Sequence, residues 1–119
     1  MTRVFVYGTL KRGGSNHHHL AGQRFVGVGR TEPGFRLYDL GGYPGMVAVA
    51  AGEKGKAIEG EIWDVGDDAL AGLDELEGLA EGLYERMPVR LQAPFAGERI
   101  ESYLYLRSVT GRRELGEVW

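Results

Sequence analysis

The sequence contains no cysteine, and its few histidines are poorly placed to replace it as metal ligands. Without cysteine there are no disulfides, no thiolate zinc sites and no cysteine nucleophile, and the absence is typical of a reducing compartment. The three histidines are consecutive, at positions 17–19. Neighbouring side chains diverge by about 100° on a helix and alternate on a strand, so three in a row do not converge on one ion. We therefore expect no metal site, and we expect His17 to have a structural role.

A surplus of positive charge and a long apolar run are also missing. The chain has 14 basic and 17 acidic residues, with a net charge of −3. No basic stripe is present that would neutralise several phosphates, so nucleic acid is not an expected partner. No stretch has the length and composition of a signal peptide or a membrane span. These absences predict a cytoplasmic protein without a membrane partner, and they leave its oligomeric state open.

Proline is scarce, whereas glycine is abundant. The 20 glycines and 4 prolines make up about 20% of the 119 residues, below the roughly 25–30% that marks low-complexity chains. Hydrophobic residues, at 43%, are sufficient for a core, and no repeat or linker divides the chain. We therefore expect one domain spanning residues 1–119. The excess of glycine indicates many turns and a few places where the backbone approaches another group.

Short strand-like runs separated by glycine- or proline-marked turns occupy most of the chain. They are residues 3–7, 23–28, 35–40, 46–51, 57–65, 84–91 and 100–107. Their spacing is that of hairpins and short crossovers, which predicts an α+β fold dominated by a mostly antiparallel sheet or barrel. Residues 67–79 have helical period instead, with Asp67 or Asp68 as the cap and Gly78 or Gly82 as the end. A second, short helix is expected over residues 15–21.

Glu77 lies on the apolar side of the predicted helix. At about 100° per residue it falls within the arc of Leu70, Leu73 and Leu76, whereas Asp74 lies at the edge of that arc. A carboxylate on a packed face is costly unless it is paired or protonated, and burial raises its pKa toward the range of a base at neutral pH. Alternatively, Glu77 lies at a frayed helix end and pairs with a cation such as Arg86.

The last predicted strand has two different faces. Ile100, Ser102, Leu104 and Leu106 alternate to one side, which we expect to be core. Tyr103 and Tyr105 lie on the other side, flanked by charged residues. That second face is either the wall of a wet cavity or an exposed surface.

A glycine-containing loop follows the first strand, from Gly8 to Ser15. Such a loop presents backbone N–H groups to an anion, and a side chain at Gly8 would block that approach. Gly8, Gly13 and Ser15 match a phosphate-binding loop, but Gly14 stands where its lysine is required and no parallel βαβ pattern follows. We therefore do not predict a nucleotide ligand.

Three segments resemble the signatures of the gamma-glutamylcyclotransferase-like superfamily. The first is residues 4–13, VFVYGTLKRG, followed by Asn16, His17 and Leu20. The second, residues 73–86, places the helix-end acid Glu77 seven positions before Tyr84. The third is the late strand that contains Tyr103. The segments lie in family order and nearly span the chain, which is most similar to the compact branch that includes gamma-glutamylamine cyclotransferases.

The resemblance implies a small mixed barrel with helices packed outside and a cavity at one end. It also implies release of 5-oxoproline and a free amine or amino acid from a small gamma-glutamyl amide, without metal or cofactor. Carried over by position, Glu77 is the catalytic acid and base. The substrate-holding loop is Tyr7, Gly8, Thr9 and Leu10, and Tyr84 and Tyr103 line the pocket. The identity of the leaving amine does not transfer with the resemblance.

Two other functions fit the same scaffold. One is a non-catalytic module that binds a small molecule, which the retained acid at position 77 disfavours. The other is removal of a gamma-glutamyl protecting group from a biosynthetic intermediate. That reaction requires the same Glu77, so only a comparison of substrates separates it from the release of 5-oxoproline from a small gamma-glutamyl amide.

Overall fold

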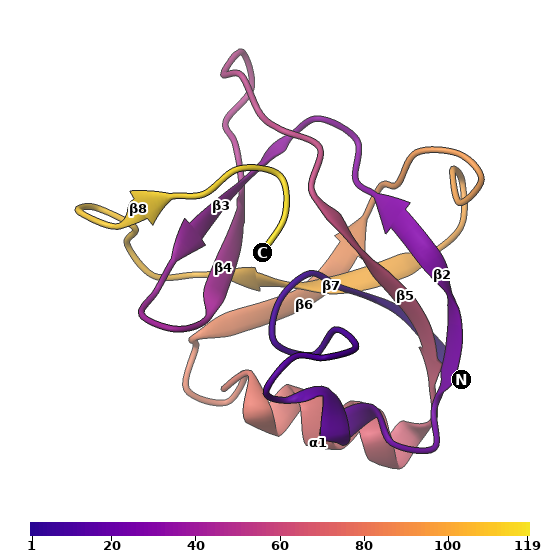
Figure 1. Ribbon diagram of the computed structural model, residues 1–119. Helices are drawn as coiled ribbons and strands as arrows, with labels where there is room; N and C mark the ends of the chain where they lie inside the picture. Colours follow the sequence, from indigo (N-terminus) through magenta and orange to yellow (C-terminus); the bar gives the residue numbers. More distant parts are fainter.

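The computed structural model describes residues 1–119, and eight strands form its sheet (Figure 1). The strands are β1 (Thr2–Val6), β2 (Arg24–Arg30), β3 (Phe35–Asp39), β4 (Pro44–Ala48), β5 (Glu59–Val65), β6 (Tyr84–Val89), β7 (Ile100–Tyr105) and β8 (Arg113–Glu114). One α-helix, α1 (Asp67–Leu76), packs beside a single 3-10 turn, η1 (His17–Leu20). In Figure 1 both lie below the sheet.

The sheet is mixed and curls back on itself. Its order is β2-β5-β1-β7-β4-β3-β8, and β6 pairs with β7 beside this path. The β1–β7 and β4–β7 pairs are parallel, and all other pairs are antiparallel. A bridge between Thr31 and Leu91 joins the chain after β2 to the chain after β6. The resulting curled half-barrel confirms the predicted α+β fold with a mixed, mostly antiparallel sheet.

The second half of β1, Val4–Val6, is buried on both faces, which explains its uninterrupted apolar sequence. Val4 and Val6 belong to a core cluster that includes Leu73 of α1. Phe5 and Tyr7 belong to a second cluster, inside the curl of the sheet. Alternate residues of a strand point to opposite faces, so one short strand contributes to two cores. The chain that leaves β1 therefore starts from a firmly fixed position.

The ends of α1 decide where Glu77 lies. The predicted caps Asp67 and Asp68 are wrong, because the N-cap is Gly66, and both aspartates lie inside the first turn, where the helix dipole favours a negative charge. At the other end Gly78 has a φ of +66°, a conformation that glycine adopts without strain. The helix therefore ends at Leu76, earlier than predicted, and Glu77 is its C-cap.

Several predicted boundaries also differ from the structure. Strand β4 begins at Pro44 rather than Met46, since a proline is tolerated as the first residue of a strand. The expected helix over residues 15–21 is only the 3-10 turn η1. Strand β7 ends at Tyr105, so Leu106 lies beyond it and is 52% exposed, contrary to its predicted place in the core.

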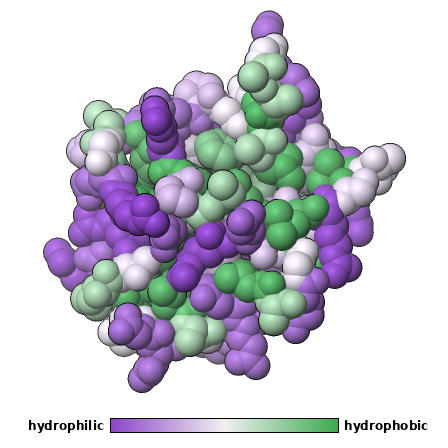
Figure 2. Space-filling view, turned by 180° about the vertical axis from the view of Figure 1, so that it is seen from behind, coloured by the Kyte–Doolittle hydropathy of each residue, from purple (hydrophilic) through white to green (hydrophobic).

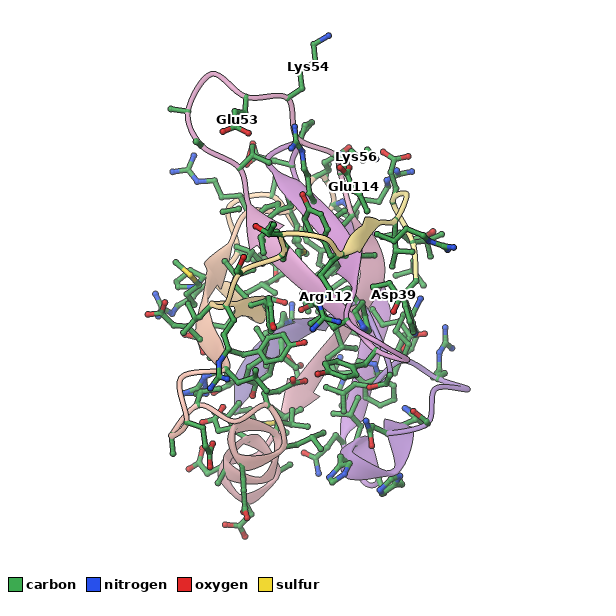
Figure 3. The ribbon with its side chains drawn as sticks, turned by 90° about the vertical axis from the view of Figure 1, so that its left-hand side faces the viewer. Asp39, Glu53, Lys54, Lys56, Arg112 and Glu114 are labelled. Carbon is green, nitrogen blue, oxygen red and sulfur yellow. The ribbon has the colours of Figure 1, made fainter.

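The C-terminal segment adds strand β8, which pairs antiparallel with β3 and was not predicted from the sequence. Lys56 Nζ and Glu114 Oε2 form an ion pair at 2.8 Å, visible in Figure 3. The N–H of Leu115 donates to the carbonyl of Leu37 at 2.7 Å. These contacts fix the outer edge of the β3–β4 hairpin, whose far end contributes to the site described below.

Hydrophobic and hydrophilic residues are interspersed over the face seen in Figure 2. Scattered exposed apolar side chains of this kind are normal on a protein surface. None of the helices has both the length and the apolar character required to cross a membrane.

Candidate active site

A partly enclosed cavity lies where the chain leaves β1. Its lining residues are Phe5, Val6, Tyr7, Gly8, Thr9, Leu10, Tyr43, Pro44, Glu77, Tyr84 and Tyr103. All seven site residues predicted from the sequence are among them. The structure therefore brings the loop after β1, the end of α1 and two later strands to one place. It also resolves the question about β7, since Tyr103 lines this cavity and is only 3% exposed.

Glu77 is the only charged side chain among the lining residues. Its backbone N–H donates to Leu73 O at 2.9 Å, but its carboxyl group has no hydrogen-bond or ion-pair partner in the protein. Burial raises the pKa of Glu77 from its usual 4.5 to about 7, and no donor offsets this effect. The alternative pairing with Arg86 is wrong, because Arg86 Nε lies 3.6 Å from Asp74 Oδ1 and 3.7 Å from Glu101 Oε1.

Four tyrosines line the cavity, and the protein engages the hydroxyl groups of three of them, Tyr7, Tyr84 and Tyr103. Tyr7 donates to Tyr103 O at 2.7 Å and accepts from Met46 N at 3.1 Å. Tyr84 donates to Pro44 O at 2.8 Å. Burial raises the pKa of Tyr7, Tyr84 and Tyr103 above the usual 10, so all three remain protonated at neutral pH. None of these three hydroxyls therefore acts as a base at neutral pH.

The hydroxyl of Tyr103 ties the end of α1 to the sheet. It donates to Asp74 Oδ1 at 2.7 Å, three residues before Glu77 in the chain. Asp74 O also accepts from Leu79 N at 3.2 Å, just beyond the helix end. The turn that contains Glu77 is thus held on both sides of this residue.

The loop after β1 leaves a row of backbone donors free. The N–H groups of Gly8, Thr9 and Leu10 donate no hydrogen bond to another protein atom, although all three residues line the cavity. Successive free N–H groups form a site for a carboxylate or an oxyanion. Three residues of the loop that line the cavity therefore have backbone donors without a protein acceptor.

Glu61, which was not predicted as a site residue, anchors this loop. Its Oε1 accepts from Arg12 N at 3.0 Å and from Trp63 Nε1 at 3.2 Å, and its Oε2 accepts from Arg12 Nε at 3.0 Å. His17 supports the loop from the other side, with Nδ1 2.9 Å from Leu10 O and its ring against Trp63. This confirms the predicted structural role of His17. No group of three or more His, Asp or Glu side chains is arranged to hold a metal ion.

Gly8 is required for a packing reason that the sequence does not reveal. A Cβ atom at this position would lie 2.5 Å from Pro44 Cγ and 2.8 Å from Pro44 Cδ. The proline ring is rigid, so it does not move aside as a flexible side chain would. Gly8 thus allows the loop to pack directly on the start of β4.

A turn ahead of β4 places Tyr43 and Pro44 at the cavity. Asp39 Oδ1 accepts from Gly41 N at 2.8 Å and Gly42 N at 3.3 Å, and the first of these bonds is the main reason that the pKa of Asp39 is lowered. Gly41 and Gly42 both have positive φ, of +102° and +88°. Figure 3 shows Asp39 close to Arg112 at the β3 end of the hairpin.

Solved structures share this fold. An AIG2-like protein from Mus musculus is 27% identical, with a TM-score of 0.74, and the match covers 100% of this chain and 88% of the mouse chain. A uropathogenic Escherichia coli protein, c4763, is 28% identical, with a TM-score of 0.80 and coverage of 98% and 88%. The curled half-barrel with one helix is therefore an established architecture, and the chain has the fold of the AIG2-like proteins.

The family model described as "Gamma-glutamyl cyclotransferase, AIG2-like" matches residues 4–119, and the chain belongs to this family. The gamma-glutamylaminecyclotransferase of Rattus norvegicus is 31% identical over 116 residues, which cover 88% of this chain and 77% of the rat protein. A relative from Vibrio cholerae is 46% identical over 74 residues, or 62% of this chain. That match spans 60% of the length of the Vibrio relative.

Proposed function

We propose that the protein is a cyclotransferase that releases 5-oxoproline and a free amine from a small gamma-glutamyl amide. The observation that carries this proposal is the environment of Glu77, a carboxyl group with a raised pKa and no protein partner. It shares its cavity with three free backbone N–H groups. A base that titrates near neutral pH and a site for an anion are the two groups that this reaction requires. The rat relative is named for the same type of activity.

The reaction begins with the α-ammonium group of the substrate. Ionised Glu77 takes one proton from it, and the neutral nitrogen attacks the γ-carbonyl carbon, forming the C–N bond of a five-membered ring. Glu77 then returns this proton to the amide nitrogen, and the bond between that nitrogen and the γ-carbon breaks as the carbonyl re-forms. The ring nitrogen still carries two hydrogens and loses one of them to Glu77, which passes it to the released amine. The products are 5-oxoproline and the free amine, so one carboxyl group alternates between base and acid.

The loop and the tyrosine walls serve this cyclisation in two ways. The N–H groups of Gly8, Thr9 and Leu10 hold the α-carboxylate or the oxyanion that develops on the γ-carbonyl, and loss of one such donor typically costs about 3 kcal/mol. The rings of Tyr7, Tyr84 and Tyr103 keep the substrate folded, with its nitrogen close to its own carbonyl. This proximity contributes several kcal/mol to lowering the barrier.

Replacing Glu77 by glutamine tests the proposal directly. Glu77→Gln keeps the shape of the side chain but accepts no proton, so we expect 5-oxoproline release to fall by about 10²–10⁴-fold. In the wild type, kcat/KM should rise with pH and reach half of its maximum at about pH 7, because Glu77 acts in its ionised form. Release is measured by chromatography across a panel of gamma-glutamyl amides.

Glu75→Gln is the matched control, since Glu75 is an exposed acid on the same helix. We expect this variant to retain the wild-type rate. Circular dichroism establishes that both variants are folded. Wild-type turnover by a folded Glu77→Gln protein would contradict the assignment of Glu77, and a folded wild type that is silent on the whole panel would favour a binding function instead.

A further inference from the structure

A network of charged side chains lies between the end of α1 and the β6–β7 pair. Arg86 of β6 and Tyr103 of β7 are direct partners in the antiparallel register, so their side chains leave the same face of the sheet, and Glu101 shares that face. The hydroxyl of Tyr103 donates to Asp74 Oδ1 at 2.7 Å, and Arg86 Nε lies 3.6 Å from the same oxygen. Three elements therefore meet at one carboxylate oxygen of Asp74, a residue that does not itself line the cavity.

The main chain of Asp74 is also part of the turn that contains Glu77. Asp74 O accepts from Leu79 N at 3.2 Å, and Glu75 O accepts from Gly78 N at 3.1 Å. Together with the positive φ of Gly78, these two bonds form a Schellman motif in which Glu77 is the C-cap. Asp74 thus closes the turn through its main chain and ties it to β7 through its side chain.

The charges of this network oppose what the end of a helix favours. Asp74 places a carboxylate in the last turn of α1, where the helix dipole is already negative, and no basic residue lies in that turn. Arg86 supplies the compensating cation, but its Nη1 is buried without a hydrogen-bond partner, which destabilises the fold. Stability alone therefore does not account for the arrangement, and departures of this kind are concentrated at functional sites.

We propose that Asp74 is a positioning residue for the reaction, and that Arg86 holds Asp74 in place. Asp74 keeps the ring of Tyr103 and the carboxyl group of Glu77 at fixed positions in the wall of the cavity. The inference rests on the proposed function, and it adds a residue that touches neither the substrate nor the reacting atoms. Without the side chain of Asp74, the turn moves toward solvent and the carboxyl group of Glu77 becomes hydrated.

Asp74→Ala removes the acceptor of the Tyr103 hydroxyl. We expect kcat for 5-oxoproline release to fall by at least about tenfold, because a small displacement of Glu77 misaligns the proton transfers. KM should change by less than about threefold, since the free N–H groups of the loop after β1 are not touched. The pH at which kcat/KM reaches half of its maximum should fall from about 7 by at least about one unit, because hydration lowers the pKa of Glu77. A merely structural role would reduce the amount of folded protein without moving this pH.

Asp74→Asn separates the position of Glu77 from the charge of Asp74. The amide oxygen of asparagine still accepts from the Tyr103 hydroxyl but carries no negative charge. We expect this variant to keep kcat within about threefold of the wild type and to reach half-maximal kcat/KM near pH 7. An asparagine variant that behaves like the alanine variant would show that the charge acts on Glu77, and would overturn the inference. Glu75→Ala, at the exposed neighbouring acid, is the matched control and should change neither quantity.

The other end of the same hydrogen bond gives an independent test. Tyr103→Phe removes the donor and keeps the ring, so its effects should resemble those of Asp74→Ala. Because both changes break one bond, the double variant should be no slower than the slower single variant, within about twofold. Losses that multiply would mean that the two residues act separately, and would overturn the inference. If Asp74→Ala does not fold, a folded Tyr103→Phe protein with wild-type kcat and an unchanged pH profile overturns it as well.

NMR titration decides the inference without turnover. If a folded wild-type protein releases 5-oxoproline from none of the gamma-glutamyl amides, the proposed function fails. The titration of the Glu77 carboxyl carbon, assigned by its loss in Glu77→Gln, is then compared between the wild type and Asp74→Ala. A midpoint lower by at least about one pH unit in the alanine variant supports the positioning role of Asp74. An unchanged midpoint overturns it.

Discussion

Glu61 and Glu77 lie beside the same loop, but their carboxyl groups are in opposite electrostatic situations. Burial alone would raise the pKa of Glu61, yet hydrogen bonds from the backbone and side chain of Arg12 and from Trp63 outweigh it and lower the pKa. Burial raises the pKa of Glu77 to about 7 with no hydrogen bond to counter it. One carboxylate is fixed in its charged form, and the other changes its charge near neutral pH.

The comparison shows that partners, rather than burial alone, decide what a buried acid does. Glu61 accepts three hydrogen bonds, so its charge is used to hold the loop between β1 and η1. Glu77 accepts none and faces the cavity, so its charge is available to a ligand. Glu61 thus holds the Arg12 end of the loop, whereas the titratable Glu77 lies at the cavity with the Gly8 end.

The largest expected difference between the two acids is in how stability depends on pH. In the folded state the pKa of Glu77 is about 7, compared with its usual 4.5. The protonated side chain therefore contributes its full share to stability below about pH 4.5, and this contribution is lost as the pH rises through 7. The loss amounts to up to about 3 kcal/mol. Glu77→Gln should therefore be more stable than the wild type at pH 8 and similar to it at pH 4. Urea unfolding at both pH values measures this difference.

Glu61→Gln should show the opposite trend. The lowered pKa of Glu61 means that its contribution is present above its usual 4.5 and is lost as the pH falls below that value. The variant should be less stable than the wild type at pH 7, by about 1–3 kcal/mol, and the difference should shrink in acid. The contrast between the two acids would be wrong if both variants followed the same pH trend.

Gly8→Ala should disturb the Glu77 end of the loop while leaving the Glu61 anchor in place. The added Cβ would lie 2.5 Å from Pro44 Cγ, so the loop or β4 must shift. We expect a loss of about 1–3 kcal/mol in stability and slower 5-oxoproline release, because the free N–H groups move with the loop. Thermal unfolding and kcat/KM measure the two effects.

Gly72→Ala is the control for this substitution. Gly72 lies within α1 and a Cβ there meets nothing within 4 Å, so the change should stabilise the protein by up to about 1 kcal/mol. A Gly8→Ala variant that is as stable and as active as the wild type would show that contact with Pro44 does not constrain the loop.

Tyr84→Phe should have the smallest effect and tests why the pKa of Glu77 is high. The variant keeps the ring wall but loses the bond to Pro44 O, at a cost of about 1 kcal/mol. Because burial is the cause of the raised pKa of Glu77, the midpoint of the kcat/KM profile should stay near 7. A midpoint lowered by one pH unit or more would indicate that the tyrosine hydroxyl contributes to the pKa of Glu77.

Much of the fold was predictable because it depends on local pattern. The apolar run of β1 and the place of Gly78 just beyond the end of α1 both follow from the sequence. Strand β8 was not predictable, since it has two residues and exists only because it pairs with β3. The start of β4 was missed because proline usually signals a turn, whereas here it pairs with Asp39 at the strand end.

The residues of the candidate site likewise fall into those that local sequence predicts and those that depend on distant contacts. Glu77 was identified by its place among leucines on a helix, which is a local property. Pro44 and Glu61 were missed, because each acquires its role through a contact with a residue distant in sequence, Gly8 and Arg12 respectively. The pair Tyr43-Pro44 after two glycines is a recognisable turn signal, but nothing in it indicates that the turn reaches the loop after β1.

Strand β7 pairs with β1, β4 and β6, and it supplies Tyr103 to the cavity. During synthesis the chain emerges from its N-terminus, so β1 and β4 lack their common neighbour until residue 105 is available. Folding must then close contacts between segments that are far apart in sequence, which is a slow and cooperative kind of step. The cavity is complete only after this step, and ligand binding by a nascent or refolding chain would therefore report that β7 has joined β1 and β4.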